Sequence, residues 1–237
     1  MHESLFIGKN VISLETIDST NDYAKQLLST QKPTDGTLII AKAQTKGRGQ
    51  LGNIWQTESG KNLTVSYILY PNFLSPDKQF YLNMAVALGI REFCESICAE
   101  HVQIKWPNDI YFEGRKLAGI LCERIHGDPR SIIIGIGVNV NAREFPAEIV
   151  ATATSLAQVC TEEQNIRALW IRICRSLAHR LRRATALLSP QTINEFNAHA
   201  WRYILRPEIS AAPLEFQTLL ADGRAQCKDG IILDMAG

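Results

Sequence analysis

The sequence lacks several features that would assign it to a broad class of protein. Its longest apolar runs, such as Ile132–Val140, are far shorter than the roughly 20 residues of a membrane-spanning helix. Residues 1–8 contain no basic segment followed by an apolar one, so we expect no secretory signal and a cytoplasmic protein. Lys and Arg total 25, Asp and Glu total 24, and the net charge of +1 does not favour nucleic-acid binding. We therefore expect neither a membrane nor a DNA partner.

Paired metal-binding motifs are also missing. The six cysteines include no C-x-x-C pair, and the five histidines have no ligand spacing to any cysteine. Cys94 and Cys98 are four residues apart on a predicted helix and would share one face of it. Because no export signal is present, reduced thiols in the core are a better interpretation than disulfides or a zinc site.

The patterns that are present alternate between helix and strand. Capping residues and apolar periodicity predict helices from Asp18 to Leu28, from Ser75 to about Ala99, from Thr161 to before Ser189, and over Gln191–Ala200. The predicted strands are Phe6–Leu14, Thr37–Ala43, Leu63–Leu69, Val102–Trp106, Asp109–Glu113, Lys116–Arg124 and Ser131–Val140. The connections between the last four are too short for crossover helices, so these strands should pair antiparallel. The fold class is α+β, with a mixed, largely antiparallel sheet that carries helices.

The segment after about Arg202 has no helical period. It contains two turn signals, Ala221-Asp222-Gly223 and Lys228-Asp229-Gly230, which predict hairpins in a small β appendage. We divide the chain into a main domain at 1–190 and a unit at 191–237 that comprises one helix and this appendage.

Three segments could carry chemistry. Lys46–Gly52 contains three glycines and two cations, so its backbone amides could turn toward one anion, although a flexible basic hairpin is an equally good interpretation. It is not a phosphate-binding P-loop, because the sequence has no GxxxxGKS or GxxxxGKT pattern, and it is not the dinucleotide fingerprint, because no helix is expected to follow it. Lys105–Asp109 followed by Arg115–Leu121 predicts polar side chains at the ends of two strands. For any single residue there, an ordinary hairpin with a solvated lysine remains the better interpretation.

Gly135–Asn141 places small residues in a buried strand, where backbone or ligand must approach closely.

Together these segments resemble the biotin–protein ligase family. The signatures are Ser19-Thr20-Asn21 before the first helix, a GRG-containing loop that ends at Trp55, KWPND followed by RKLAGIL, and a G-x-G-x-N strand. They occur in the family's order over roughly residues 10 to 160. The joined KWPND and RKLAGIL motifs are highly specific. The resemblance implies a catalytic core similar to class II aminoacyl-tRNA synthetases and lipoate ligases, with an SH3-like β domain at the C-terminus.

The resemblance also implies an activity and a set of site residues. Such a ligase forms biotinyl-5′-AMP from biotin and ATP and transfers biotin to a lysine of an acceptor domain of a biotin-dependent carboxylase. Lys116 and Arg48 would be catalytic. The implied biotin-binding residues are Ser19, Thr20, Asn21, Gln44, Arg48, Gly49, Gln50, Lys116 and Gly119. The implied nucleotide-binding residues are Gly47, Arg48, Trp55, Asn108, Asp109, Lys116 and Asn139. Asp109 would hold Mg²⁺, and whether the protein forms a homodimer is left open.

Two departures from the family pattern affect these expectations. Gln50 stands where many bacterial members carry a second arginine, so the loop has one cation fewer and its grip on the adenylate should be weaker. Only 18 residues precede Ser19, so we expect no helix-turn-helix domain of the kind that many bacterial members carry. We expect the loop to be mobile without ligand, because its cations repel one another until an anion arrives. Competing functions are a lipoate–protein ligase, a DNA-binding biotin sensor and a non-catalytic vitamin-binding module.

Overall fold

The architecture comes from a computed structural model. It describes residues 8–71, 74–75, 78–98, 101–125, 128–181, 189–204, 209–210 and 212–234. A seven-stranded sheet forms the centre of the molecule, with strand order β1-β2-β3-β7-β6-β5-β4. Its strands are β1 (Val11–Ile17), β2 (Thr37–Gln44), β3 (Leu63–Leu69), β4 (Val102–Lys105), β5 (Asp109–Phe112), β6 (Arg115–Ile125) and β7 (Asp128–Val138).

The sheet is mixed, as the sequence predicts. β1 and β2 are parallel, because α1 (Thr20–Thr30) connects them, and every other neighbouring pair is antiparallel. The antiparallel pairing of the four strands from β4 to β7 is confirmed. The pairing of β5 with β6 brings the KWPND and RKLAGIL motifs together, since Asp109 lies opposite Gly119.

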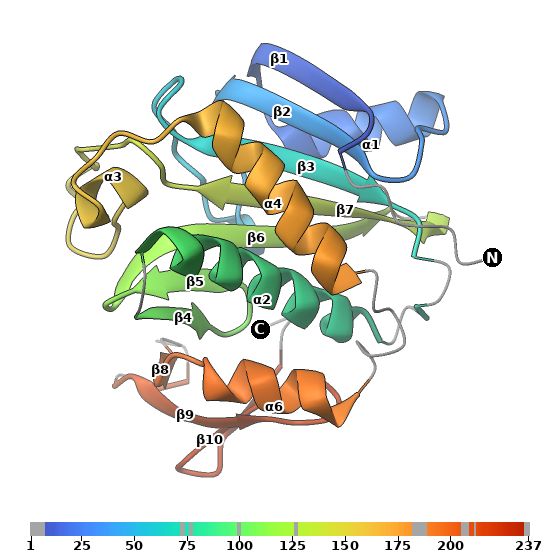
Figure 1. Ribbon diagram of the computed structural model, residues 1–237. Helices are drawn as coiled ribbons and strands as arrows, with labels where there is room; N and C mark the ends of the chain where they lie inside the picture. Colours follow the sequence, from blue (N-terminus) through green and yellow to red (C-terminus); the bar gives the residue numbers. More distant parts are fainter. Residues whose placement is uncertain are drawn as a thin grey trace.

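Helices cover the two faces of the sheet unequally (Figure 1). α2 (Gln79–Cys98) and α4 (Ile166–Leu181) lie side by side across one face and bury the large core with the apolar side chains of the strands. α1 (Thr20–Thr30) packs on the other face, where Ala24 joins a small cluster with Ile39, Ile68 and Ile133. In the described part of the chain α1 covers only part of this face, and a cavity opens beside it.

Several element boundaries differ from the prediction, most of all the starts of β1, α4 and α2. β1 begins at Val11 and continues to Ile17, because parallel pairing with β2 sets its register; residues 6–7 of the predicted strand lie outside the described residues. The predicted cap at Thr161 is wrong. α4 begins at Ile166, after Asn165 Oδ1 accepts a hydrogen bond from Ala168 N (3.1 Å), and Thr161 has a positive φ of 61°. α2 begins at Gln79 rather than near Ser75, and residues 76–77 are outside the described part.

A second, four-stranded antiparallel sheet follows α6 (Pro190–Ala198). Its order is β11-β10-β9-β8, with β8 (Tyr203–Ile204), β9 (Leu214–Leu219), β10 (Ala225–Cys227) and β11 (Ile232–Leu233). Both predicted turns are present, with positive φ at Gly223 and Gly230. Trp106 Nε1 donates to Gly223 O (3.3 Å), so this unit packs against the KWPND segment. The division at residue 190 stays a prediction.

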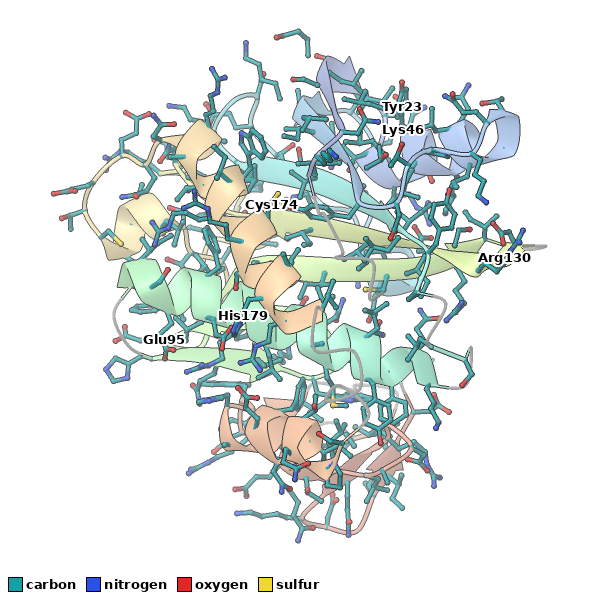
Figure 2. All side chains as sticks on the ribbon, turned by 45° about the vertical axis from the view of Figure 1, so that its right-hand side comes forward. Tyr23, Lys46, Glu95, Arg130, Cys174 and His179 are labelled. Atoms are coloured by element: carbon teal, nitrogen blue, oxygen red, sulfur yellow. The ribbon has the colours of Figure 1, made fainter. Side chains whose placement is uncertain are left out.

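The cysteines have no disulfide partners in the structure, and among the described residues no cluster of three or more His, Cys, Asp or Glu side chains is arranged to hold a metal ion. Cys174 lies between α4 and the sheet, where its sulfur is 3.4 Å from the hydroxyl of Tyr67 (Figure 2). Within the described part of the chain, none of the helices has the length and apolar character needed to cross a membrane.

Candidate functional site

A cavity of about 470 Å³ opens on the face of the sheet that α1 partly covers. Small residues on three adjacent strands leave space for this cavity. Thr64 of β3 lies opposite Gly137 of β7, which lies opposite Gly119 of β6. This volume is within the usual range for small-molecule sites.

One end of the cavity is polar and uncharged. Ser19 caps α1 by accepting from Asp22 N (3.4 Å), and Thr20 begins the helix. Gln44 Oε1 accepts from both Thr20 N (2.7 Å) and Thr20 Oγ1 (3.0 Å), which fixes the carboxamide. The hydroxyl of Ser66 lies 2.7 Å from Thr20 Oγ1. This end offers fixed hydrogen-bonding groups to a neutral polar ligand.

Asn21 is buried and lies beneath this polar end. Its Nδ2 donates to Glu123 Oε2 (2.8 Å) and to Leu121 O (3.3 Å), and its Oδ1 lies 2.5 Å from the Ser66 hydroxyl. A Cβ at Gly135 would lie 2.3 Å from Asn21 Oδ1. Glycine at 135 is therefore required by the Asn21 side chain.

Lysine side chains converge at the other end. Lys116 Nζ is 2.7 Å from Asp109 Oδ1, and Lys116 N donates to Thr152 O (2.7 Å). Lys105 also lines the cavity, and its Nζ donates to the hydroxyl of Tyr111 (3.1 Å). Burial lowers the pKa of Lys105, and nearby Lys116 lowers it further, against the opposing effect of Asp109. This end is suited to anionic groups.

The loop from Lys46 to Trp55 forms the outer wall and is held by its own hydrogen bonds. Gly49 N donates to Asn53 O (2.7 Å), and Trp55 N donates to Gly47 O (2.9 Å). Lys46, beside the start of α1 in Figure 2, pairs with Asp18 (2.9 Å). Arg48 pairs with Asp22 and Glu123. The expectation that the loop cations repel one another is therefore wrong, because carboxylates of the protein already neutralise them.

Trp55 folds inward from this loop onto the floor of the cavity. A Cβ at Gly137 would lie 2.3 Å from the indole of Trp55, and one at Gly119 would lie 3.2 Å from it. Lys116 Nζ is 5.7 Å from the centre of the ring. The close approach predicted for the glycines of β7 is thus made by side chains of this chain, Trp55 and Asn21.

The structure brings nearly all of the predicted site residues into this one cavity. Its lining includes Ser19, Thr20, Asn21, Gln44, Arg48, Gly49, Gln50, Trp55, Asn108, Asp109, Lys116 and Gly119. Gly47 and Asn139 are not part of the lining. Gly47 lies beneath Trp55, where a Cβ would be 2.2 Å from Trp55 O, and Asn139 Nδ2 donates to Thr154 O (3.0 Å).

Lys105 is a lining residue that the sequence reasoning missed. The signal was available, since Lys105 is the first residue of KWPND and alternates along β4 with buried Val102 and Ile104. Ile204 of β8 also lines the cavity, so the C-terminal unit contributes to the site.

Comparison with known proteins assigns the family. Residues 13–139 match the model of the Biotin/lipoate A/B protein ligase family. The matched region covers more than half of the chain and contains every predicted site residue. The chain belongs to this family.

Individual members show the extent of the likeness. The chain is 26% identical to a biotin protein ligase from Aquifex aeolicus in complex with biotin and ATP, with a TM-score of 0.79 over 95% of this chain and 96% of that one. It is 37% identical to the bifunctional ligase/repressor BirA of Bacillus spizizenii over 66% of this chain and 49% of that protein. It is 29% identical to a biotin–[acetyl-CoA-carboxylase] ligase of Mycobacterium tuberculosis over 62% of this chain and 54% of that one. The chain therefore spans about half the length of these two curated relatives.

Proposed function

We propose that this chain is a biotin–protein ligase. It joins biotin to the AMP part of ATP as biotinyl-5′-AMP with release of pyrophosphate, and it then passes the biotin to a lysine of an acceptor domain with release of AMP. The observation that carries the proposal is one cavity with a fixed polar end at Thr20 and Gln44 and a cationic end at Lys105 and Lys116. The two ends match a neutral ureido ring and the carboxylate with its phosphates. The similar Aquifex aeolicus structure is a complex with biotin and ATP.

The cations of the cavity reduce the main electrostatic barrier of the reaction, which is repulsion between two anions. A carboxylate must attack a phosphate that is itself an anion, and two unit charges 4 Å apart repel by about 4 kcal/mol at an effective dielectric of 20. Arg48 and Lys116 both line the cavity, so their charges can offset this repulsion and stabilise the charge that grows on the α-phosphate. No covalent enzyme intermediate is needed. The wall formed by the loop and Trp55 would shield the adenylate from water.

Asp109 is our proposed ligand for Mg²⁺. Magnesium is usually held by one or two carboxylates together with substrate phosphates, and Asp109 is a carboxylate in the lining of the cavity. When bound, the ion would neutralise phosphate charge. Because Asp109 pairs with Lys116, these two residues would hold the cation and the phosphates next to each other.

Lipoate–protein ligase is the nearest alternative, because the family includes lipoate ligases. We expect pyrophosphate release from ATP in the presence of biotin and little with lipoate, since the paired carboxamide and hydroxyl of Gln44 and Thr20 suit a ureido ring. Parallel pyrophosphate assays with each acid measure the preference. Equal or greater release with lipoate would replace the proposed substrate.

Two other functions have less support. A DNA-binding regulator is disfavoured by the net charge of +1, although the similar Bacillus spizizenii protein is a bifunctional ligase/repressor. A binding module without catalysis would not need Arg48 and Lys116, and both line the cavity. We propose no DNA partner.

A further inference from the structure

Glu123 is a carboxylate just outside the motifs that joins three parts of the site. It lies on β6, two residues after Leu121 of the cavity lining. Its Oε1 accepts from Lys25 Nζ of α1 (2.8 Å) and from Arg48 of the loop (2.9 Å). Its Oε2 accepts from Asn21 Nδ2 at the base of the polar end (2.8 Å). One side chain thus ties α1, the loop and β6 together.

The contacts leave Arg48 able to meet a ligand. Arg48 pairs through Nη1 with Asp22 and through Nη2 with Glu123. A guanidinium has five N–H donors, so these two bonds fix its plane and leave donors for an incoming anion. Asp22 and Glu123 balance Arg48 and Lys25 in charge, so the cluster is neutral before ligand binds.

The environment of Glu123 makes its charge effective. Only 18% of its side chain is exposed, against 86% for Glu15, which pairs with Lys42 at the sheet edge. Burial raises the pKa of Glu123, but hydrogen bonds from Lys25 and Asn21 and the charge of Arg48 lower it by more. The carboxylate therefore stays ionised, and its pairing is screened less by water than an exposed pair would be.

We infer that Glu123 is a positioning residue, which orients Arg48 and holds the loop closed over the cavity. The inference rests on the proposed function, because it assigns Glu123 a part in forming the adenylate. A purely structural ion pair would stabilise the fold without acting through Arg48. The two roles differ in what happens once Arg48 is absent.

The first test is a double-mutant cycle of Glu123→Gln and Arg48→Ala, read as the maximal rate of pyrophosphate release with biotin and ATP. Glutamine keeps the size of the side chain and removes its charge. We expect E123Q to lower the rate about tenfold in the wild-type background, equivalent to about 1.4 kcal/mol. In the Arg48→Ala background we expect less than a twofold further loss, as for residues that act as a unit. Equal losses in both backgrounds, or no loss in either, would overturn the inference.

Glu15→Gln is the matched control. It makes the same substitution in a carboxylate paired with Lys42 and outside the cavity lining, so the rate should equal that of the wild type. A loss in E15Q as large as in E123Q would show a general charge effect and also overturn the inference.

Amide hydrogen exchange in the ligand-free protein tests the inference without any activity. We expect the amides of Gly49 and Trp55 to exchange at least fivefold faster in E123Q, while those of β2 and β3 keep their protection. Unchanged protection of the loop would contradict the positioning role. If the wild type released no pyrophosphate with biotin, the proposed function would fail, and the exchange result would still decide whether Glu123 holds the loop.

Discussion

Replacing Lys116 by alanine should lower the rate of adenylate formation on the order of 10²-fold, the usual scale for losing one stabilising donor. Its charge matters most as charge grows on the phosphate, so biotin binding should change far less. The loss has a second source in the structure. Lys116 Nζ lies 2.7 Å from Asp109 Oδ1, so removing it also takes from Asp109 its lysine partner. Pyrophosphate release and biotin calorimetry measure the two effects separately.

Lys42→Ala provides the comparison for Lys116→Ala. Lys42 also pairs with a carboxylate, Glu15, but its side chain is 57% exposed and outside the cavity lining. Lys42→Ala should therefore leave both the rate of pyrophosphate release and the affinity for biotin unchanged. If the rate for Lys116→Ala were within about threefold of the wild type, a difference in activation free energy of about 0.65 kcal/mol, Lys116 would have no catalytic role.

Gly137→Ala should cause the second largest loss of activity, because the Trp55 indole packs directly against Gly137. The added Cβ would lie 2.3 Å from the indole, and β7 cannot retreat because it pairs with both β3 and β6. Overpacking of this kind costs about 1–3 kcal/mol. The strain should be relieved by moving Trp55 out of the cavity. We expect adenylate formation to fall by roughly 10-fold or more, which corresponds to about 1.4 kcal/mol.

A Trp55→Ala background separates the clash from other effects of the new methyl group. Trp55→Ala alone should lower activity, and adding Gly137→Ala to it should cost little more, because the contact no longer exists. Gly137→Ala could instead lower the rate by the same factor with and without Trp55. The methyl group would then act on the sheet or the ligand directly, and the proposed packing of Trp55 against Gly137 would be wrong.

The sequence predicted the site where local signals were strong. The short spacing predicted that the strands beginning at Asp109 and near Lys116 pair antiparallel, and the family resemblance placed both residues in one site; in the structure Lys116 Nζ lies 2.7 Å from Asp109 Oδ1. The cap at Ser19 likewise placed Thr20 at the start of α1. In both cases the geometry follows from contacts between residues close in the chain.

The missed features depend on contacts between distant residues. Glu123 lies outside the motifs, and its role appears only when the fold brings Lys25 and Arg48 to it. The glycines of β7 predicted a close approach, but nothing local indicates that Trp55 makes it. The error at Thr161 has a local cause, because both Thr161 and Asn165 are good capping residues and the signal alone did not choose between them.

The central claim is that this cavity forms a biotinyl adenylate and delivers biotin to a protein lysine. The most direct measurement is the intact mass of a biotin-acceptor domain after incubation with the protein, biotin, ATP and Mg²⁺. We predict a mass gain of one biotinyl group, located on one lysine and absent when ATP is omitted. An unchanged mass, with an acceptor that a known ligase modifies under the same conditions, would contradict the claim.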